Sequence, residues 1–176
     1  MCLYTKDSEP KVAQTDIKAY KCFRSVREVY SSKPYRDMTT LFLGCPITHE
    51  EATGKVPLIG KNHKEPRKVT SFDTEWTEVG SGYIHAFTDR ETAVHVMKNN
   101  FIGRDWYFPV VAEVTIPKGT VYYEGIDNKG FNTYAAEKMV VNGYHECLVD
   151  NKILDYTSYV AVLEKTVKAR EKQVFE

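Results

Sequence analysis

The sequence predicts an α+β fold made mainly of antiparallel β-sheets with a few helices, and three observations lead to this prediction. Short segments rich in β-branched and aromatic residues follow one another along most of the chain, as strands do. Glycine, proline, asparagine and aspartate separate many of these segments, which is typical of turns. Only two segments, beginning near residues 88 and 158, have the spacing of an amphipathic helix.

The length and the charge balance narrow the class of protein. A chain of 176 residues is long enough for one domain with a sizeable core. Lys and Arg number 24 and Asp and Glu 24, so no overall field attracts nucleic acid or an anionic membrane, and bulk nucleic-acid binding is not expected. We expect a polar N-terminal arm over residues 1–15 and a single α+β domain over residues 16–176.

The sequence gives no signal for a membrane segment, secretion or a metal. No apolar run reaches the roughly 18–20 residues that a membrane helix needs. The first residues lack the charged-then-apolar pattern of a signal peptide, so a cytoplasmic location is expected. Neither the four cysteines nor the five histidines have the spacing of zinc ligands, and we expect no metal.

The first half of the chain contains two expected strands and a long connection. Residues 17–24 and 39–45 are rich in aromatic and aliphatic side chains and are expected to be strands. Residues 49–68 contain Gly and Pro with little periodicity, which predicts a long loop, and such loops often bind or cover ligands. A solvated loop is the favoured interpretation of its basic cluster, and a surface that faces phosphate is the alternative. The cluster consists of Lys61, His63, Lys64, Arg67 and Lys68.

The clearest local pattern lies at residues 82–100. Residues 82–87 predict a short strand, and Thr88 with Glu91 has the spacing of a capping box that opens a helix. The helix is expected to end at Asn99 and Asn100. A helix N-terminus presents free N–H groups that suit a phosphate or a carboxamide oxygen.

The second half predicts a series of strands and a closing helix. Residues 108–116, 121–124 and 137–141 are expected strands. The dipeptide Asn142-Gly143 predicts a two-residue hairpin turn, after which residues 144–149 pair back. From about Ser158 the apolar spacing predicts a helix, and a strand through residues 159–163 is the alternative.

Polar residues at the ends of expected strands are the candidates for a functional site. Tyr20 and Lys21 lie on the first strand, and Tyr83, His85 and Thr88 lie on the strand that leads into the helix. Glu137 precedes the apolar run at residues 139–141. The sequence contains no Ser-His-Asp order, phosphate-binding glycine loop or paired-carboxylate motif.

These segments, in this order, resemble three motifs of the ADP-ribosyltransferase-like superfamily. The motifs are an aromatic–basic pair on the first strand, a central strand leading to a helix, and a late strand preceded by Glu. Here they are Tyr20-Lys21, residues 82–88 and residues 137–140. Residues 82–88 are similar to an element of one small bacterial family of this group, and residues 116–123 look like short phage-encoded proteins.

The resemblance covers roughly residues 17–145 and implies a split sheet with NAD as substrate in the cleft and no metal. Glu137 would stabilise an oxocarbenium-like transition state as nicotinamide leaves, and His85 is the second candidate catalytic residue. Tyr83 or His85 would stack on nicotinamide, and Lys21 or Arg24 would hold phosphate. The residues implied in binding NAD are Tyr20, Lys21, Arg24, Tyr83 and Thr88.

The chain departs from the family pattern at three positions. Lys21 stands where Arg or His is usual, and Thr88 is the only hydroxyl residue retained in the second motif. Ala135 replaces the acid found two residues before the catalytic Glu in arginine-modifying members, so arginine transfer is not expected. The alternative is a non-catalytic module that binds a nucleotide or a protein on the same fold. A phage-encoded accessory or counter-defence protein acting through protein contacts is a further alternative.

Each candidate residue also has a purely structural interpretation. Glu137 has the position of a solvated edge carboxylate, and His85 that of a hydrogen-bonded core histidine. Thr88 is accounted for as a helix cap, and the tyrosines as core or rim aromatics.

Overall fold

The computed structural model describes residues 2–26, 39–42, 45–46, 48–100, 107–149 and 152–155, together with six separate positions between 158 and 172. The described residues form a 14-stranded sheet, in which every strand pairing is antiparallel. Two helices accompany it, the single turn α1 (His49–Ala52) and α2 (Arg90–Asn100). The expected α+β class, mainly antiparallel, is therefore confirmed.

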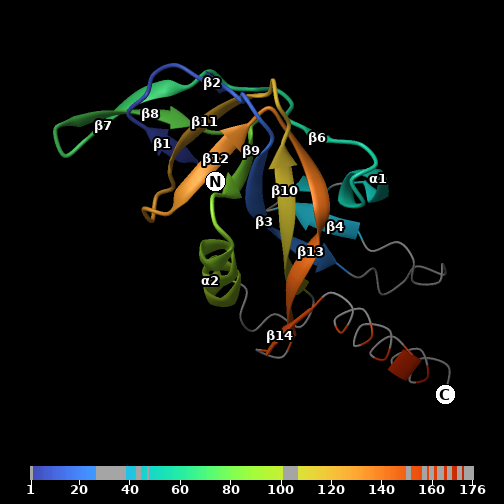
Figure 1. The fold of residues 1–176 in the computed structure, drawn as a ribbon. Helices are drawn as coiled ribbons and strands as arrows, with labels where there is room; N and C mark the ends of the chain where they lie inside the picture. Colours follow the sequence, from blue (N-terminus) through green and yellow to red (C-terminus); the bar gives the residue numbers. More distant parts are fainter. Residues whose placement is uncertain are drawn as a thin grey trace.

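The sheet consists of two blocks of strands, which meet at one narrow junction (Figure 1). The first block has the order β14 (Lys152–Leu154), β13 (Lys138–Val149), β10 (Tyr107–Ile116) and β3 (Ile17–Val26). Beside β3 lies β4 (Thr39–Phe42), followed by β5 (Cys45–Pro46), while β6 (Leu58–Ile59) pairs with the start of β13.

The second block is built from shorter strands. Its order is β9 (Ile84–Phe87), β12 (Asn132–Ala136), β11 (Val121–Ile126), β1 (Leu3–Thr5), β8 (Thr74–Val79) and β7 (Arg67–Ser71). The short strand β2 (Lys11–Val12) pairs with β11. The junction between the blocks is the single pair Tyr20↔Phe87 between β3 and β9.

Alternation along β10 explains how its two faces are used. Val110, Ala112, Val114 and Ile116 join the largest core cluster, whereas Val111 faces the other way. On that second face α2 buries Ala93 and Met97 against β3 and β10. Full burial of a side chain such as Met97, which is 0% exposed, contributes about 1.5–3 kcal/mol.

The start of α2 differs from the expected capping box by one residue. Asp89, rather than Thr88, is the N-cap: its Oδ1 accepts the Thr92 amide at 2.8 Å, and its carbonyl accepts the Ala93 amide at 3.3 Å. Thr88 is still part of the sheet, because its amide donates to the Asn132 carbonyl at 3.2 Å. The prediction of Thr88 and Glu91 as a capping box is therefore wrong, while the helix end at Asn100 agrees with the prediction.

The predicted hairpin turn at Asn142-Gly143 is also wrong, because β13 runs straight through it. Gly143 pairs with Glu113 and Val141 with Val114, so Asn142 is an extra residue in a β-bulge. Its side-chain amide donates to Thr115 Oγ1 at 2.6 Å. A type I′ turn needs positive φ at both central residues, and neither Asn142 nor Gly143 has it.

Residues 2–15 do not form an arm outside the domain. Strand β1 lies between β11 and β8, and its Leu3 is fully buried. Ala13 is also buried and exchanges backbone hydrogen bonds with Gly119 and Thr120. The prediction of a polar N-terminal arm is therefore wrong. Leu3 and Ala13, two of the few apolar residues in this segment, are buried and pack it against the domain.

The expected loop over residues 49–68 contains regular elements. It includes α1, β6 and the first residues of β7, which pairs with β8 in a hairpin. The hairpin turns at Phe72 and Asp73, which both have positive φ. The prediction of one long loop is therefore wrong in this segment.

Of the closing helix expected from Ser158, the structure describes only separate positions. These positions are helical and exposed, and they are Ser158, Ala161, Lys165, Lys168, Ala169 and Lys172. The apolar residues that predicted the helix, Val160, Leu163 and Val167, lie outside the described residues. Within the described part of the chain, no helix is long and apolar enough to cross a membrane.

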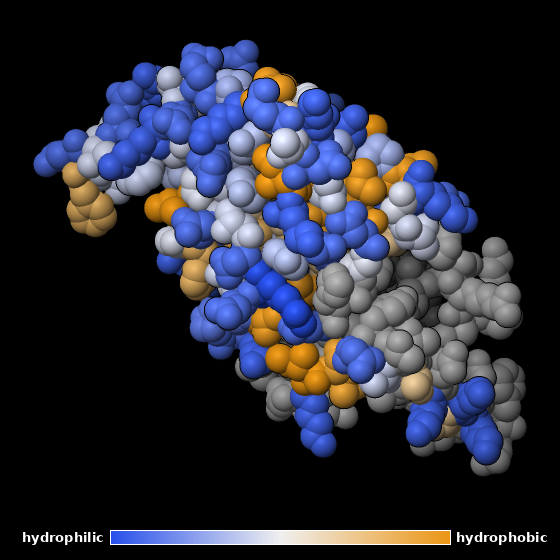
Figure 2. Space-filling model, in the orientation of Figure 1, coloured by the Kyte–Doolittle hydropathy of each residue, from blue (hydrophilic) through white to orange (hydrophobic). Residues whose placement is uncertain are grey.

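Apolar side chains reach the surface at scattered places. Figure 2 shows them in small separate groups among hydrophilic ones on the face that it draws. The large exposed ones belong to different elements and are Val12, Val56, Ile59, Phe72 and Ile153. Ligand recognition is therefore better sought in a cavity than on this face.

Candidate functional site

Pairing between β9 and β12 brings three of the candidate residues to one face. Ala136 pairs with Ile84 and Ala135 with His85. Glu137 and Tyr83 come one residue beyond the last pair of this ladder, so the same register continued by one step sets them opposite each other. Because residues that oppose each other in a ladder share a face, Tyr83, His85 and Glu137 lie on the same side of the sheet.

The backbone of Glu137 is held from both sides. Its amide donates to the Val121 carbonyl at 3.1 Å, and its carbonyl accepts the Gly60 amide at 2.8 Å. The side chain is partly exposed. The main chain of Glu137 is thus fixed just after β12, by β11 on one side and by Gly60 on the other.

Tyr83 contacts two other rings. It stacks on His63 with ring centroids 4.4 Å apart and 22° between the planes, and it meets Tyr123 edge-on at 5.7 Å and 90°. The close approach depends on Gly82, whose φ is +95° and whose missing Cβ would lie 2.6 Å from the His63 Cα. The segment around His63 can therefore lie directly against Tyr83.

Tyr83, Tyr123 and His63 line a cavity of about 380 Å³. Its walls come from the segment after β1, from residues 63–68, from β8 and from the two tyrosines. The remaining lining residues are Ser8, Glu9, Pro10, Lys64, Glu65, Pro66, Lys68 and Thr77. We refer to this cavity as the tyrosine pocket.

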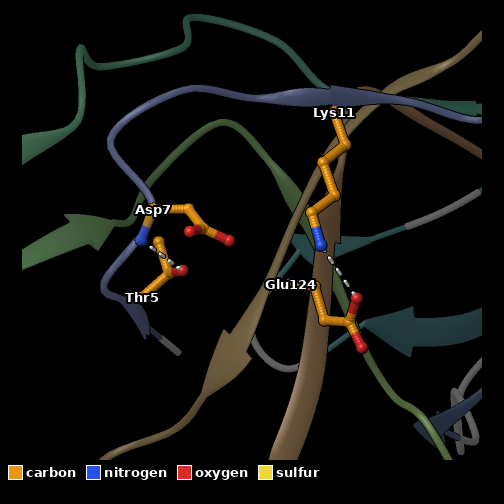
Figure 3. A network of polar contacts seen from close by, with 4 residues as sticks. All are labelled: Thr5, Asp7, Lys11 and Glu124. Carbon is orange, nitrogen blue, oxygen red and sulfur yellow. Dashed lines mark hydrogen bonds and ion pairs between the residues drawn. The ribbon is translucent and has the colours of Figure 1, made fainter.

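The N-terminal wall of the tyrosine pocket is anchored at both ends (Figure 3). Before it, the Asp7 amide donates to Thr5 Oγ1 at 3.1 Å. After it, the Lys11 ammonium lies 3.4 Å from Glu124 Oε2, and β2 pairs with β11. Residues 8–10 are therefore held over the pocket by the strands on either side.

Nearby carboxylates act on both pocket tyrosines. Burial raises the pKa of Tyr83, and the negative charge of Glu137 raises it further. Burial also raises the pKa of Tyr123, with further increases from Tyr83, Glu9 and Glu137. Glu137 therefore lies within electrostatic range of both rings.

His85 is enclosed in the sheet rather than presented at the pocket. Its side chain is 4% exposed, and Nε2 lies 3.2 Å from the Gly80 carbonyl, so Nε2 carries the proton. Loss of solvation lowers the pKa of His85 to about 4, and the ring is neutral at pH 7. Its Nδ1 is buried without a protein partner.

Lys21 lies inside the molecule at the junction of the two blocks. It is 1% exposed, and its ammonium donates to the main-chain carbonyl of His85. The ladder between β3 and β9 stops at Tyr20↔Phe87, so the ammonium joins the two strands where backbone pairing has ended. In this arrangement the charge of Lys21 is directed at a carbonyl and not at solvent.

The other candidates lie away from Tyr83. Tyr20 packs against the cluster beneath α2, and Thr88 follows the opposite end of β9, which spans about 13 Å. The backbone of Arg24 pairs with Pro109 and Leu41, and its side chain lies outside the described residues. The structure thus brings Tyr83, His85 and Glu137 to one face of the sheet near the start of β9. Tyr20 and Thr88 lie near the opposite end of β9.

Two of the five residues of the basic cluster at residues 61–68 are paired with carboxylates of the hairpin. Arg67 lies 2.9 Å from Glu78 and Lys68 lies 2.9 Å from Glu75. His63, Lys64 and Lys68 nevertheless line the tyrosine pocket, so this segment does face a cavity. Tyr123, Glu9 and Glu65 are pocket residues that the sequence did not indicate, since long-range strand pairing brings them there.

Neither similarity to known proteins nor a metal-binding group among the described residues identifies the site. No protein-family model, curated protein or solved structure matches this chain. Among the described residues, no group of three or more His, Cys, Asp or Glu side chains could hold a metal ion. The function must therefore be argued from the site itself.

Proposed function

We propose that the chain breaks the bond between nicotinamide and ribose in NAD and transfers the ADP-ribose to an acceptor or to water, with Glu137 as the carboxylate that stabilises the transition state. The observation that carries this proposal is the position of Glu137 just after β12, where its charge acts on the phenols of Tyr83 and Tyr123. The two tyrosines line the tyrosine pocket, and Glu137 lies beside it without being one of its lining residues. The order of the three motifs in the sequence points the same way.

Cleavage of the bond between nicotinamide and ribose is favoured by a fixed negative charge near the ribose and by an aromatic ring that stacks on nicotinamide. When the bond between nicotinamide and ribose breaks, positive charge develops on the ribose, and a preorganised carboxylate lowers the energy of that state. The two backbone hydrogen bonds at Glu137 fix the main chain from which such a carboxylate would act. Tyr83 would offer its ring to the departing nicotinamide.

The arrangement of the strands supports the finer assignment of the fold to the split sheet of the ADP-ribosyltransferase-like group. The two blocks are joined by one residue pair between β3 and β9, and the first two motifs lie on these strands. Glu137 follows β12, the neighbour of β9.

The direct test is the release of nicotinamide from NAD by the purified protein. We expect release by the unchanged protein and a loss of at least about 100-fold with Glu137→Gln, the range typical for removing one transition-state contact. Glu91→Gln is the matched control, because Glu91 is an exposed carboxylate on α2, beyond the far end of β9. No release with any acceptor, or equal release by Glu137→Gln, would remove the catalytic proposal.

A second candidate is a non-catalytic module that binds a nucleotide or a protein. The burial of Lys21 and His85 favours it, since a lysine bonded to a main-chain carbonyl presents no free charge to a phosphate. Calorimetry with NAD and ADP-ribose separates the two candidates. Saturable binding without nicotinamide release supports the module.

A further inference from the structure

We propose that the tyrosine pocket binds a small organic cation, namely a guanidinium or ammonium group. The proposed binding site is the part of the pocket that Tyr83, Tyr123, Glu9 and Glu65 line. Binding there does not depend on NAD turnover.

The two tyrosines supply the geometry that organic cations prefer. Their rings stand at 90° with centroids 5.7 Å apart, and both line the same cavity. Perpendicular rings form a corner, and the negative faces of aromatic rings attract a cation within about 6 Å. The volume of about 380 Å³ admits a side-chain-sized group, at the small end of the range for ligand pockets.

Both carboxylates and lysines line the cavity, and the carboxylates are the charged groups that act on the two phenols. Glu9 and Glu65 line the pocket. The charges of Glu137 and Glu65 raise the pKa of Tyr83, and those of Glu9 and Glu137 raise the pKa of Tyr123. No lysine is among the groups that shift either phenol, although Lys64 and Lys68 line the cavity.

One of the two pocket lysines is paired with a carboxylate outside the cavity. Lys68 forms an ion pair with Glu75 at 2.9 Å, and Glu75 does not line the cavity. The Lys64 amide donates to the Ser81 carbonyl, and its side chain is exposed. The aromatic corner is therefore the place where a cation gains both ring contact and carboxylate attraction.

The experiment is a titration of the full chain with defined cations. The probes are arginine amide, lysine amide and tetramethylammonium, and citrulline amide serves as the control that keeps the shape of arginine but lacks the guanidinium charge. The readout is the NMR signals of the Tyr83 and Tyr123 rings, assigned with Tyr83→Phe and Tyr123→Phe. We expect saturable shifts of these signals with at least one cation and none with citrulline amide, and the ranking of the cations distinguishes guanidinium from ammonium.

Two variants test the charge. Glu9→Gln and Glu65→Gln change exposed side chains, and each is expected to weaken binding by about 3- to 5-fold, the effect of one partly screened charge. The double variant Glu50→Gln with Glu91→Gln removes two exposed carboxylates that do not line the pocket and should bind as the unchanged protein does. Equal shifts with citrulline amide, no shift with any cation, or no effect of both pocket variants would overturn the proposal. The titration contains no NAD and leaves Glu137 intact, so its outcome is separate from that of the nicotinamide assay.

Discussion

At the scale of single residues, the environment of a side chain decides which of its chemical properties is available. His85 and Glu137 lie on the same face of neighbouring strands, yet one is enclosed and the other partly exposed. His85 is neutral and bound to a main-chain carbonyl, which fits a structural role. Glu137 is the residue of this pair that a ligand could reach.

Burial of His85 should make stability depend on pH. Its pKa is lowered to about 4 in the folded protein from 6.5, so the folded state binds fewer protons than the unfolded state between these values. The contribution of His85 is thus fully present above pH 6.5 and is lost as the pH falls toward 4, reaching about 2 kcal/mol of destabilisation at pH 5. Urea unfolding at pH 7 and pH 5 measures it. The variant His85→Gln should lose less stability over this interval, and an equal loss in both proteins would contradict the burial argument.

The cap of α2 gives a second test at the scale of a residue. Asp89→Ala removes the acceptor of two hydrogen bonds from Thr92 and should lower the free energy of unfolding by about 1 kcal/mol. Thr88→Ala serves as the comparison, because the sheet uses the amide of Thr88, which alanine keeps. Urea midpoints measure both variants. A larger loss from Thr88→Ala than from Asp89→Ala would restore Thr88 as the cap.

At the scale of elements, patterns within one strand were predictable and contacts between distant segments were not. The alternation of Val110, Val111 and Ala112 identified β10, because burial on opposite faces repeats every two residues. The burial of Leu3 depends on β11 and β8, which are far away in the sequence, so the pattern of residues 1–15 could not show it.

Local turn preference was overridden in β13. Asn-Gly specifies a hairpin when nothing else holds the chain, but here pairing with β10 continues on both sides of it. The candidate site also combines residues that local sequence patterns indicate with residues that they do not. Tyr83 and Glu137 could be predicted because they lie at the ends of expected strands. Tyr123 and Glu9 line the pocket only because β1, β2 and β11, which are distant in the sequence, pair with one another.

Glycine substitutions distinguish a bulged strand from a turn at Gly143. An added Cβ at Gly143 meets nothing within 4 Å, and the residue has no positive φ, so Gly143→Ala should change stability by less than about 0.5 kcal/mol. Gly119→Ala is the matched control: the space around it is also open, but its φ of +85° should cost about 1 kcal/mol. Thermal or urea unfolding measures both. An equal cost at the two positions would indicate a turn at Gly143.

At the scale of the whole molecule, the formal net charge of zero conceals an uneven distribution. Arg67 and Lys68 are paired with Glu78 and Glu75 along the β7–β8 hairpin, while the tyrosine pocket is influenced by several carboxylates. A chain with no net positive charge and an aromatic pocket that two carboxylates line is suited to a small ligand rather than to a polyanion.

The junction between the two blocks is the feature on which the proposed nucleotide function depends most. Lys21 lies there, buried and bonded to the His85 carbonyl. Reductive methylation of the native protein, followed by mass spectrometry, should therefore modify Lys18, whose side chain is 62% exposed, much faster than Lys21 on the same strand. If NAD binding opened the junction so that Lys21 could contact phosphate, saturating NAD would change the Lys21 rate but not the Lys18 rate. Equal rates for the two lysines in the free protein would contradict the closed junction and return Lys21 to the exposed, phosphate-holding role that the motif implies.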